Sequence, residues 1–364
     1  MIFFKNDIRT KKSNMNGAGQ KKLVVFAWSD IPEYAIRCIN AFVDVFDGEV
    51  VVISAPGTGR NVRLEALLKC KISWTTRTDS RSLVDLLGRL PDYYLSGWHV
   101  PAFYRWAKEA KAAGARLFLP VDECYLRYPM KELLRCIRWR LKFSDFYDCV
   151  LVCGVAGRRL FRFYGVPDNR IFEGMCEGDP TEFYDGPPLS TRSKRIVFVG
   201  RFVEVKNILS MCEAWRRVCS KYPDWRLELY GDGPIRQKIP KCERMVVHGF
   251  KTAHELGYIY RDSQCLVLGS YHDNWGVVVH EAAMSGCLLL LSDRVGAIDD
   301  FATPENSAIF KASSVKDFAR GMEDIMSMSD EKKNLAQRIS VAKGAKFSPQ
   351  LFVQSMMAMI NLYR

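Results

Sequence analysis

The sequence predicts an α/β fold with two domains, each built around a parallel sheet. The 364 residues are more than one hydrophobic core usually serves. Short apolar runs alternate with segments of helical spacing over residues 21–164, and the same alternation restarts at residue 195. Strands that alternate with helices favour a parallel sheet. Residues 179–192 are rich in Pro, Gly, Asp, Ser and Thr, so we place the link between the domains there.

In the first half, apolar residues recur at helical spacing between positions 35 and 46, with Ile36, Ile39, Phe42 and Phe46 on one side. Strands are expected at 21–28, 49–54, 72–75, 93–96, 115–121 and 149–153. Helices are expected at 35–46, 64–68, 83–90, 101–113, 130–143 and 156–164. Residues 1–20 are polar and basic and predict a disordered tail, so the first domain covers residues 21–188.

The second half continues the pattern over residues 189–345, which we predict to be the second domain. Strands are expected at 195–199, 225–230, 245–248, 265–268 and 287–291. Helices are expected at 208–219, 254–261, 314–328, 331–342 and 348–362, with one more directly before residue 287 and a short segment at 297–301. Residues 346–364 contain the last helix, which is rich in Met.

Charge and cysteine content narrow the classes of protein. The 53 Lys and Arg residues exceed the 41 Asp and Glu residues, which gives a formal charge of +12 and favours anionic partners. Twelve cysteines without a C-x-x-C pair predict reduced thiols in the cytoplasm rather than a zinc or disulfide framework. No apolar run approaches the roughly 20 residues that a membrane span needs.

The predicted helix at 130–143 has one basic face and a separate apolar one. Leu134, Ile137 and Leu141 lie on the apolar side. Such a helix can lie on an anionic membrane surface. A solvated charged helix that covers an apolar core has the same pattern, so both interpretations stay open. The basic row is Lys131, Arg135, Arg138 and Lys142.

The strongest site signal follows the apolar run at 265–268. Residues 273–286 read D-N-W-G-V-V-V-H-E-A-A-M-S-G, which predicts a loop and then a helix at the carboxyl end of a buried strand. Open α/β sheets bind ligands at that edge. Gly276 would let a ligand approach the backbone, and the amides of Val277 and Val278 would be free donors suited to a phosphate. Asp273 and Glu281 are eight residues apart and can reach different ends of one elongated ligand.

An ordered set of motifs resembles the retaining GT-B glycosyltransferases of family 4, the group 1 type. The family carries E-x-F-G-x4-E-A-M-A-x-G, so Asp273 stands at its first Glu and Glu281 at its second. Its G-R-x4-K pair matches Gly200, Arg201 and Lys206, and its G-x-G-P matches residues 231–234. The specific motifs cover residues 194–364, and over the first half the similarity is architectural.

The resemblance implies a role for each matched residue. Arg201 and Lys206 would hold the donor pyrophosphate and stabilise the departing diphosphate. Glu281 would bind the ribose hydroxyls, and Asp273 would contact hydroxyls of the transferred sugar. These four residues form the predicted catalytic set. The predicted donor-binding set is Gly200, Phe250, Lys251, Asn274, Trp275, Gly276, Val277 and Val278, with Phe250 and Lys251 near the base.

The resemblance also bears on cofactors and on the acceptor. No D-x-D motif lies near the donor loop, so we expect no metal ion and no other cofactor; the two cations would supply the positive charge. Residues 28–32 read W-S-D-I-P where the family has a Gly-rich loop. His99 and Asp122 both follow predicted strands, and either could orient the acceptor.

The resemblance implies two Rossmann-like domains that face a cleft, with the last helix packed back on the first domain. The predicted activity is transfer of a hexose from a nucleotide sugar to a lipid-linked glycan with retention, in bacterial cell-envelope polysaccharide assembly. We expect a cytoplasmic protein at the inner face of the membrane, with no nucleic-acid partner.

Two alternatives come from other classes. One is a basic nucleic-acid-binding module, which leaves the ordered Arg, Lys and Asp/Glu set unexplained. The other is an enzyme of the same fold, an epimerase or a phosphorylase; a phosphorylase would need a pyridoxal lysine, which we do not find in the sequence.

Overall fold

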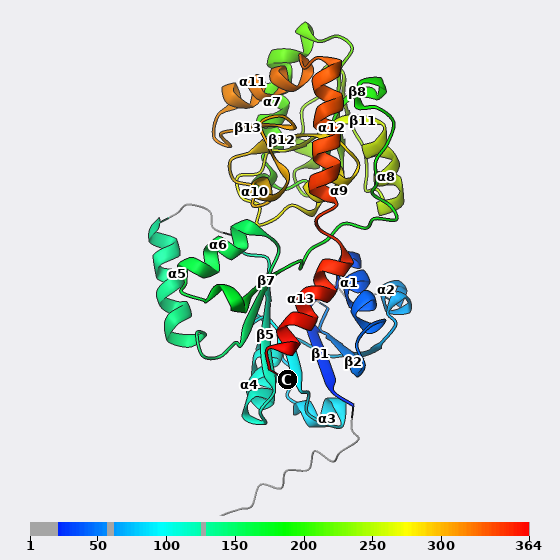
Figure 1. Cartoon of the computed structure of the whole chain (residues 1–364). Helices are drawn as coiled ribbons and strands as arrows, with labels where there is room; N and C mark the ends of the chain where they lie inside the picture. Colours follow the sequence, from blue (N-terminus) through cyan, green and yellow to red (C-terminus); the bar gives the residue numbers. More distant parts are fainter. Residues whose placement is uncertain (1–20, 57–61, 125–128, 364) are drawn as a thin grey trace, which may run out of the picture.

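The computed structural model describes residues 21–56, 62–124 and 129–363, so the predicted tail at 1–20 lies outside the described residues. Two α/β domains lie one above the other, and the chain returns at its end from the upper domain to the lower one (Figure 1). In the described part of the chain the two sheets have seven and six strands, and every pairing within them is parallel. The predicted fold class is therefore confirmed.

The first sheet has the strand order β3-β2-β1-β4-β5-β6-β7. Its central strand alternates between two cores: Val24 and Phe26 face one, and Val25 faces the other. Helices therefore cover both faces of the sheet, as parallel sheets require. The strands are β1 (Leu23–Trp28), β2 (Glu49–Ser54), β3 (Lys71–Trp74), β4 (Tyr93–Ser96), β5 (Arg116–Val121), β6 (Cys149–Val152) and β7 (Ile171–Glu173).

The helices of the first domain begin at local signals in the sequence. Ser82 and Asp85 form a capping box at the start of α3, and Pro101 occupies the first turn of α4. The helices are α1 (Glu33–Val43), α2 (Val62–Leu67), α3 (Leu83–Leu87), α4 (Pro101–Ala112), α5 (Pro129–Lys142) and α6 (Val155–Phe163), with a 3-10 turn at Asp168–Arg170.

The second sheet has the order β10-β9-β8-β11-β12-β13. Every residue of β11 and of β12 is buried, which fits the continuous apolar runs seen in the sequence. The strands are β8 (Ser193–Val199), β9 (Arg226–Tyr230), β10 (Met245–Val247), β11 (Ser263–Leu268), β12 (Leu288–Ser292) and β13 (Ser307–Phe310). The helices are α7 (Ile208–Val218), α8 (Ala253–Arg261), α9 (Val277–Met284), α10 (Ile298–Phe301), α11 (Val315–Met326), α12 (Asp330–Gly344) and α13 (Pro349–Asn361). Four 3-10 turns lie at Leu189–Thr191, Glu204–Lys206, Cys219–Lys221 and Arg236–Lys238.

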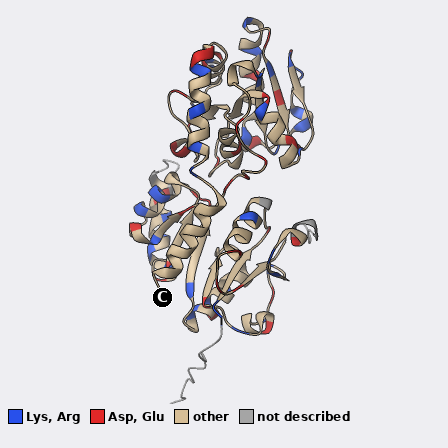
Figure 2. Cartoon of the chain, turned by 45° about the vertical axis from the view of Figure 1, so that its right-hand side comes forward, with Lys and Arg blue, Asp and Glu red and all other residues tan. Residues whose placement is uncertain are grey.

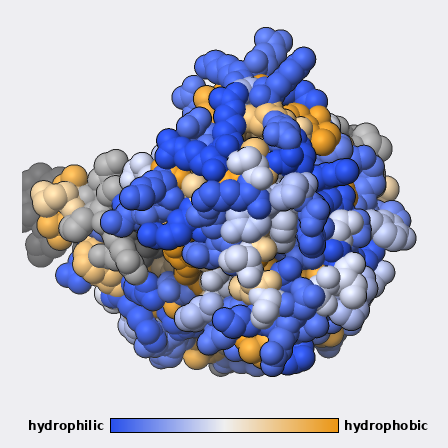
Figure 3. All heavy atoms as spheres, turned by 90° about the horizontal axis from the view of Figure 1, so that it is seen from above, coloured by the Kyte–Doolittle hydropathy of each residue, from blue (hydrophilic) through white to orange (hydrophobic). Residues whose placement is uncertain are grey.

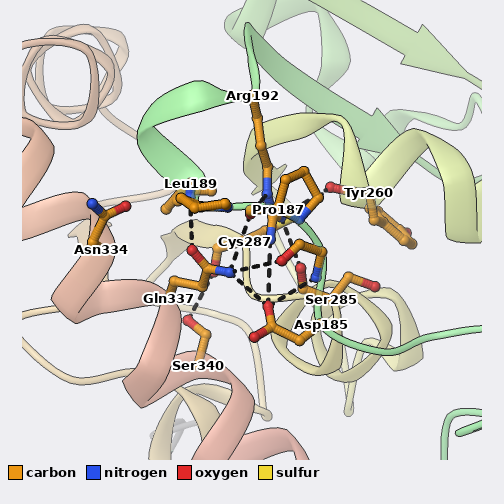
Figure 4. A network of polar contacts seen from close by, with 12 residues as sticks. Asp185, Pro187, Leu189, Arg192, Tyr260, Ser285, Cys287, Asn334, Gln337 and Ser340 are labelled. Atoms are coloured by element: carbon orange, nitrogen blue, oxygen red, sulfur yellow. Dashed lines mark hydrogen bonds and ion pairs between the residues drawn. The ribbon is translucent and has the colours of Figure 1, made fainter.

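The Pro-rich segment before β8 is fastened to the second domain rather than free. The Arg192 guanidinium is fully buried and donates to the carbonyl oxygens of Ser285 (2.8 Å) and Tyr260 (3.3 Å). Gln337 of α12 donates to the Asp185 carboxylate at 2.7 Å and accepts from the Leu189 amide at 2.6 Å (Figure 4). The contacts hold residues 185–192 against α9 and α12. The domain boundary at residue 188 stays a prediction.

The last helix, α13, lies along α1 of the first domain (Figure 1). The Phe352 ring packs on Phe26 of β1, with ring centroids 6.1 Å apart. Ser355 donates to the carbonyl oxygen of Glu173 at 2.6 Å, and Tyr363 donates to that of Asp148 at 3.1 Å. The chain thus crosses between the domains twice, once at residues 174–179 and once at residues 344–348.

Two features differ from the sequence-based expectations. The edge strands β7 and β13 were not predicted, because three or four residues that include Ser, Ala or Glu give no clear apolar run. The other difference concerns α5, whose core-facing residues are Cys136, Trp139 and Phe143; Leu134, Ile137 and Leu141 are exposed. All twelve cysteines are free thiols.

Candidate active site

Two loops at the carboxyl ends of β8 and β9 are locked together. A Cβ added to Gly231 would lie 1.9 Å from the carbonyl oxygen of Gly200, so only glycine allows this approach. The Phe202 amide donates to the Asp232 carbonyl oxygen at 2.7 Å, and the Phe202 ring is buried. The loop from Gly200 to Lys206 is therefore held rigidly at the sheet edge.

This rigid loop presents the two predicted cations differently. Arg201 is exposed, and its guanidinium has no hydrogen-bond or ion-pair partner among the described residues. The Lys206 ammonium contacts the Asp273 carboxylate at 2.6 Å, and both side chains are largely buried. Arg201 is thus a charge available to a ligand, whereas Lys206 is held in place by its neighbour.

Asp273 is fixed by its backbone as well as by Lys206. Its amide donates to the Arg294 carbonyl oxygen at 3.0 Å, and its carbonyl oxygen accepts from the Gly296 amide at 2.9 Å. The Ser270 hydroxyl donates to the same carboxylate oxygen that Lys206 contacts, at 3.3 Å. One carboxylate oxygen is therefore satisfied twice, and the other is left to face the cleft side of the loop.

The N-terminus of α9 follows directly. Gly276 has φ 83° and ψ 72°, a left-handed conformation that favours glycine, and a Cβ there would lie 2.8 Å from the Leu268 side chain. In the described chain, the amides of Val277 and Val278 have no backbone acceptor. They are donors at the positive end of a helix, the arrangement that binds phosphates.

Glu281 lies one turn further along α9 and is half-buried. Its carboxylate accepts from the Tyr260 hydroxyl at 3.4 Å. Burial raises the pKa of Glu281 to about 7, and the Tyr260 hydroxyl and the charge of Arg37 act in the opposite direction. Arg37 is itself paired with the buried Asp179 at 2.8 Å. A first-domain helix thus brings positive charge close to Glu281.

The neighbouring His280 is a structural residue. It is fully buried, its Nδ1 accepts from the Gly178 amide at 2.8 Å, and its Nε2 lies 3.0 Å from the Gly344 carbonyl oxygen. Because Nδ1 accepts, Nε2 carries the proton and donates. Burial lowers the pKa of His280 to about 4, so the ring stays neutral. It ties both interdomain crossings to α9.

The remaining motif side chains occupy two kinds of place. Trp275 is buried, donates to the Cys176 carbonyl oxygen at 3.1 Å, and packs on Phe301 and Phe347. Its side chain therefore belongs to the interdomain packing, and only its backbone faces the donor loop. Asn274 is half-buried, and a Cβ on Gly296 would lie 1.9 Å from its carbonyl oxygen.

The predicted base-binding residues lie after β10. The Phe250 side chain is 79% exposed, which is unusual for so large an apolar group. Lys251 is paired with Glu255 of α8 at 2.8 Å. The Gly249 carbonyl oxygen accepts from the Gly231 amide at 3.1 Å, so this turn lies beside the locked loops. An exposed ring at this sheet edge is a surface on which a flat base can stack.

The first domain contributes a separate cavity of about 350 Å³ at the carboxyl ends of β1, β4 and β5. His99 and Asp122 both line it, so the structure brings the two acceptor candidates together. Trp28, from the W-S-D-I-P loop, closes another side. The adjoining Cys124 thiol lies 3.9 Å from the Asp273 carbonyl oxygen, which puts the edge of the cavity next to the donor loop.

Two residues near the site were missed in the sequence. Arg37 gave no signal because it is one polar position on an amphipathic helix. Tyr260 lies on α8, 21 positions before Glu281. Among the residues that the structure describes, no three His, Cys, Asp or Glu side chains are grouped to hold a metal ion.

The chain shares this arrangement with known proteins. Residues 181–340 match the sequence model of the family described as glycosyl transferases group 1. The second half of this chain is a group 1 glycosyltransferase domain. The resemblance of its motifs to that family is therefore confirmed.

Two curated relatives match over this part of the chain. One is the human phosphatidylinositol N-acetylglucosaminyltransferase, of which a single component is 29% identical over 152 residues; these are 40% of this chain and 31% of the relative. The other is an uncharacterized glycosyltransferase of Haemophilus influenzae, 19% identical over 164 residues, which are 42% of this chain and 46% of the relative. The chain thus spans less than half the length of either relative.

Solved structures are similar over almost the whole chain. Anabaena HepE in complex with UDP and glucose has a TM-score of 0.71 at 13% identity, covering 94% of this chain and 100% of that one. The lipopolysaccharide outer core galactosyltransferase WaaB has a TM-score of 0.69 at 14% identity, with coverage of 94% and 100%. At this identity the similarity establishes the fold, and the predicted GT-B fold is confirmed.

Proposed function

We propose that this protein transfers a hexose from a nucleotide sugar to a glycan acceptor with retention of configuration. One observation carries the proposal: Arg201, Lys206 and the free amides of α9 meet at one sheet edge. Fixed positive groups at that place favour a diphosphate, and favour it most as its charge grows in the transition state. The predicted site residues remain part of this proposal.

The donor would lie along the edge from α9 to β10. The Arg201 guanidinium and the amides of Val277 and Val278 bind the pyrophosphate, and Lys206 holds Asp273 towards the sugar. Glu281 binds the ribose hydroxyls further along α9. The exposed Phe250 ring stacks on the base. UDP in the HepE complexes supports a nucleoside diphosphate at this edge and makes UDP-sugars the first donors to test.

Retention follows from attack on the face that the diphosphate leaves. The acceptor hydroxyl oxygen forms the new bond to the anomeric carbon while the carbon–oxygen bond to the phosphate breaks. Its proton passes to the departing phosphate oxygen, so no protein base is needed. The role of Arg201 and the helix amides is to stabilise the two negative charges of the product diphosphate.

The acceptor would occupy the cavity of the first domain, where His99 and Asp122 orient its hydroxyl. We propose a lipid-linked glycan as acceptor and a place at the inner face of the cell membrane. No helix within the described ranges has the length and apolar character to cross a bilayer. Attachment would therefore use a surface of the protein.

A donor screen by thermal shift tests the proposal. One nucleotide sugar among UDP-, GDP- and ADP-sugars should raise the Tm, because it binds the folded state only. NMR of the product should show the anomeric configuration of the donor. Activity should persist in EDTA, since the cationic pair supplies the charge. Activity that EDTA abolishes and magnesium or manganese restores would contradict the metal-independent route, and an inverted product would contradict retention.

A further inference from the structure

Helix α5 has two apolar faces, and only one of them belongs to the core. Cys136, Trp139 and Phe143 face inwards and are at most 5% exposed. A second stripe points outwards, away from the domain. Its residues are Met130, Leu133, Leu134, Ile137 and Leu141, with side chains 72%, 46%, 65%, 46% and 79% exposed. The outward stripe has no role in holding the helix to the domain.

The stripe is continuous. At about 100° per residue, positions 134, 137 and 141 fall within an arc of roughly 60°, almost opposite Trp139. The face of the second domain seen in Figure 3 is mostly hydrophilic, with apolar residues scattered singly. Contiguous exposed apolar side chains mark an interaction surface, whereas single ones are normal.

Basic residues flank the stripe on one side. Arg135, Arg138 and Lys142 follow one another at helical spacing, and Figure 2 shows Lys and Arg along the helix that follows the grey trace at 125–128. Arg135 lies 3.7 Å from Glu132 and 3.9 Å from Glu123. Among the described residues, Arg138 and Lys142 have no carboxylate partner. Two unneutralised cations beside an apolar stripe complement an anionic surface with an apolar interior.

The inner face of α5 supports the acceptor cavity. Trp98, which lines the cavity, stacks on Phe143 with ring centroids 4.7 Å apart and contacts Trp139 at 6.4 Å. Arg135 contacts Glu123, another lining residue. The helix therefore separates the outward stripe from the cavity by its own thickness.

We infer that α5 docks the protein on an anionic lipid membrane. The stripe enters the boundary between headgroups and acyl chains, and Arg138 and Lys142 contact anionic headgroups. The inference rests on the proposed function in one respect: a lipid-linked acceptor on that membrane would reach the cavity beside the same helix. A second copy of this chain is the rival occupant, and charge complementarity argues against it because two copies would bring like charges together.

Flotation of the full chain with vesicles tests the docking. Vesicles of phosphatidylglycerol and phosphatidylcholine should carry the protein, and vesicles of phosphatidylcholine alone should carry at least tenfold less. Raising salt from 50 to 500 mM should reduce binding, because headgroup attraction is screened. Equal binding to both vesicles, or no binding to either, would overturn the inference.

Paired variants identify the surface. Leu134→Ser with Leu141→Ser should reduce vesicle binding at least tenfold, whereas Val45→Ser with Leu335→Ser, exposed by 56% and 42% elsewhere, should not. Arg138→Glu with Lys142→Glu should abolish the preference for anionic vesicles, whereas Arg226→Glu with Lys241→Glu on the second domain should leave it. An unchanged α5 variant, or an equal loss in the controls, would overturn the role of the helix.

Two further measurements separate the rival outcomes. Light scattering should show a monomer for the wild type; a dimer that the Leu134 and Leu141 variant breaks would assign the stripe to a second copy and overturn the membrane surface. Calorimetric binding of UDP in solution should be the same for all variants. Loss of vesicle binding with intact UDP binding concerns α5 alone, while failure of any nucleoside diphosphate to bind the wild type concerns the proposed function.

Discussion

The two carboxylates of the donor loop stand in opposite electrostatic settings, although eight residues separate them. Asp273 has a cation at 2.6 Å and a hydroxyl at 3.3 Å, so its charge is neutralised locally. Glu281 has only the Tyr260 hydroxyl at 3.4 Å as a direct partner, and burial raises its pKa to about 7. One carboxylate is a fixed part of the loop, and the other waits for a partner.

This contrast suggests a division of labour. A carboxylate that Lys206 neutralises and orients can accept from a sugar hydroxyl without repelling the diphosphate. A half-buried carboxylate without a cation at contact distance gains most from two ribose hydroxyls. Arg201, exposed and unpaired among the described residues, is left for the diphosphate itself. The variants below test that division, beginning with the largest expected effect.

Arg201→Ala should weaken free nucleoside diphosphate and lower kcat/KM together. A guanidinium makes two charged hydrogen bonds to a phosphate, each worth roughly 1.5–3 kcal/mol, so the loss should be about a hundred- to a thousandfold. Arg201→Lys should recover part of it. Calorimetry of UDP beside steady-state kinetics checks this, with Arg226→Ala at the opposite end of β9 as control. Unchanged UDP affinity would remove Arg201 from the pyrophosphate site.

Asp273→Ala should lower kcat/KM by about ten- to a hundredfold and leave UDP affinity almost unchanged, since UDP lacks the sugar. Asp273→Asn keeps the shape of the side chain but removes the charge that Lys206 contacts. It should fall between the alanine variant and the wild type. If Asp273→Ala weakens UDP as much as donor, Asp273 acts through Lys206 on the diphosphate.

Glu281→Ala should weaken UDP about tenfold, because the ribose is common to donor and product. The effect should depend on pH. Since the pKa of Glu281 is raised to about 7, lowering the pH from 8 to 6 protonates the carboxylate and should weaken UDP binding in the wild type. Calorimetry at both pH values checks this. A Glu281→Gln variant with the same pH dependence as the wild type would assign the titration to another group.

Much of this arrangement could be predicted from the sequence, because the relevant signals are local. Buried strands such as β2 and β11 are continuous apolar runs, and the motif order placed Arg201, Lys206, Asp273 and Glu281 at one sheet edge. The Lys206–Asp273 contact joins two loops that are 67 residues apart, and no local pattern encodes it.

The failures come from contacts that sequence proximity does not show. Trp275 stands beside Asp273 in the chain, yet its side chain turns into the interdomain packing against Phe301 and Phe347. The outward stripe of α5 was open to two interpretations, because periodicity gives the faces of a helix but not which face meets the core. Glu177 gave no signal, since it lies in a Gly- and Pro-containing crossing that looked like a loop.

Glu177 extends the comparison to a third carboxylate, one without a hydrogen-bonded side-chain partner. Its side chain is 2% exposed, and neither oxygen has a hydrogen-bond partner within the described residues. It lies in the crossing that His280 binds at Gly178. Burial raises the pKa of Glu177 to about 8, far above the value of an exposed glutamate.

The smallest effect, and one on stability alone, is expected for Glu177→Gln. Below pH 4.5 the carboxyl is protonated in the folded and unfolded chains, so the variant should have almost the wild-type Tm. As pH rises towards 8 the unfolded chain releases the proton and the folded chain retains it, so the wild type loses stability that the amide does not lose. The Tm of the variant should therefore exceed that of the wild type by several degrees at pH 8.5 and by almost nothing at pH 4.5. Scanning calorimetry at both values measures it, with the exposed Glu331→Gln as control, and kcat/KM at pH 7 should not change. A Tm difference that is the same at both pH values would mean that the crossing accommodates the charged carboxylate, and that Glu281 rather than Glu177 is the poorly paired carboxylate of this molecule.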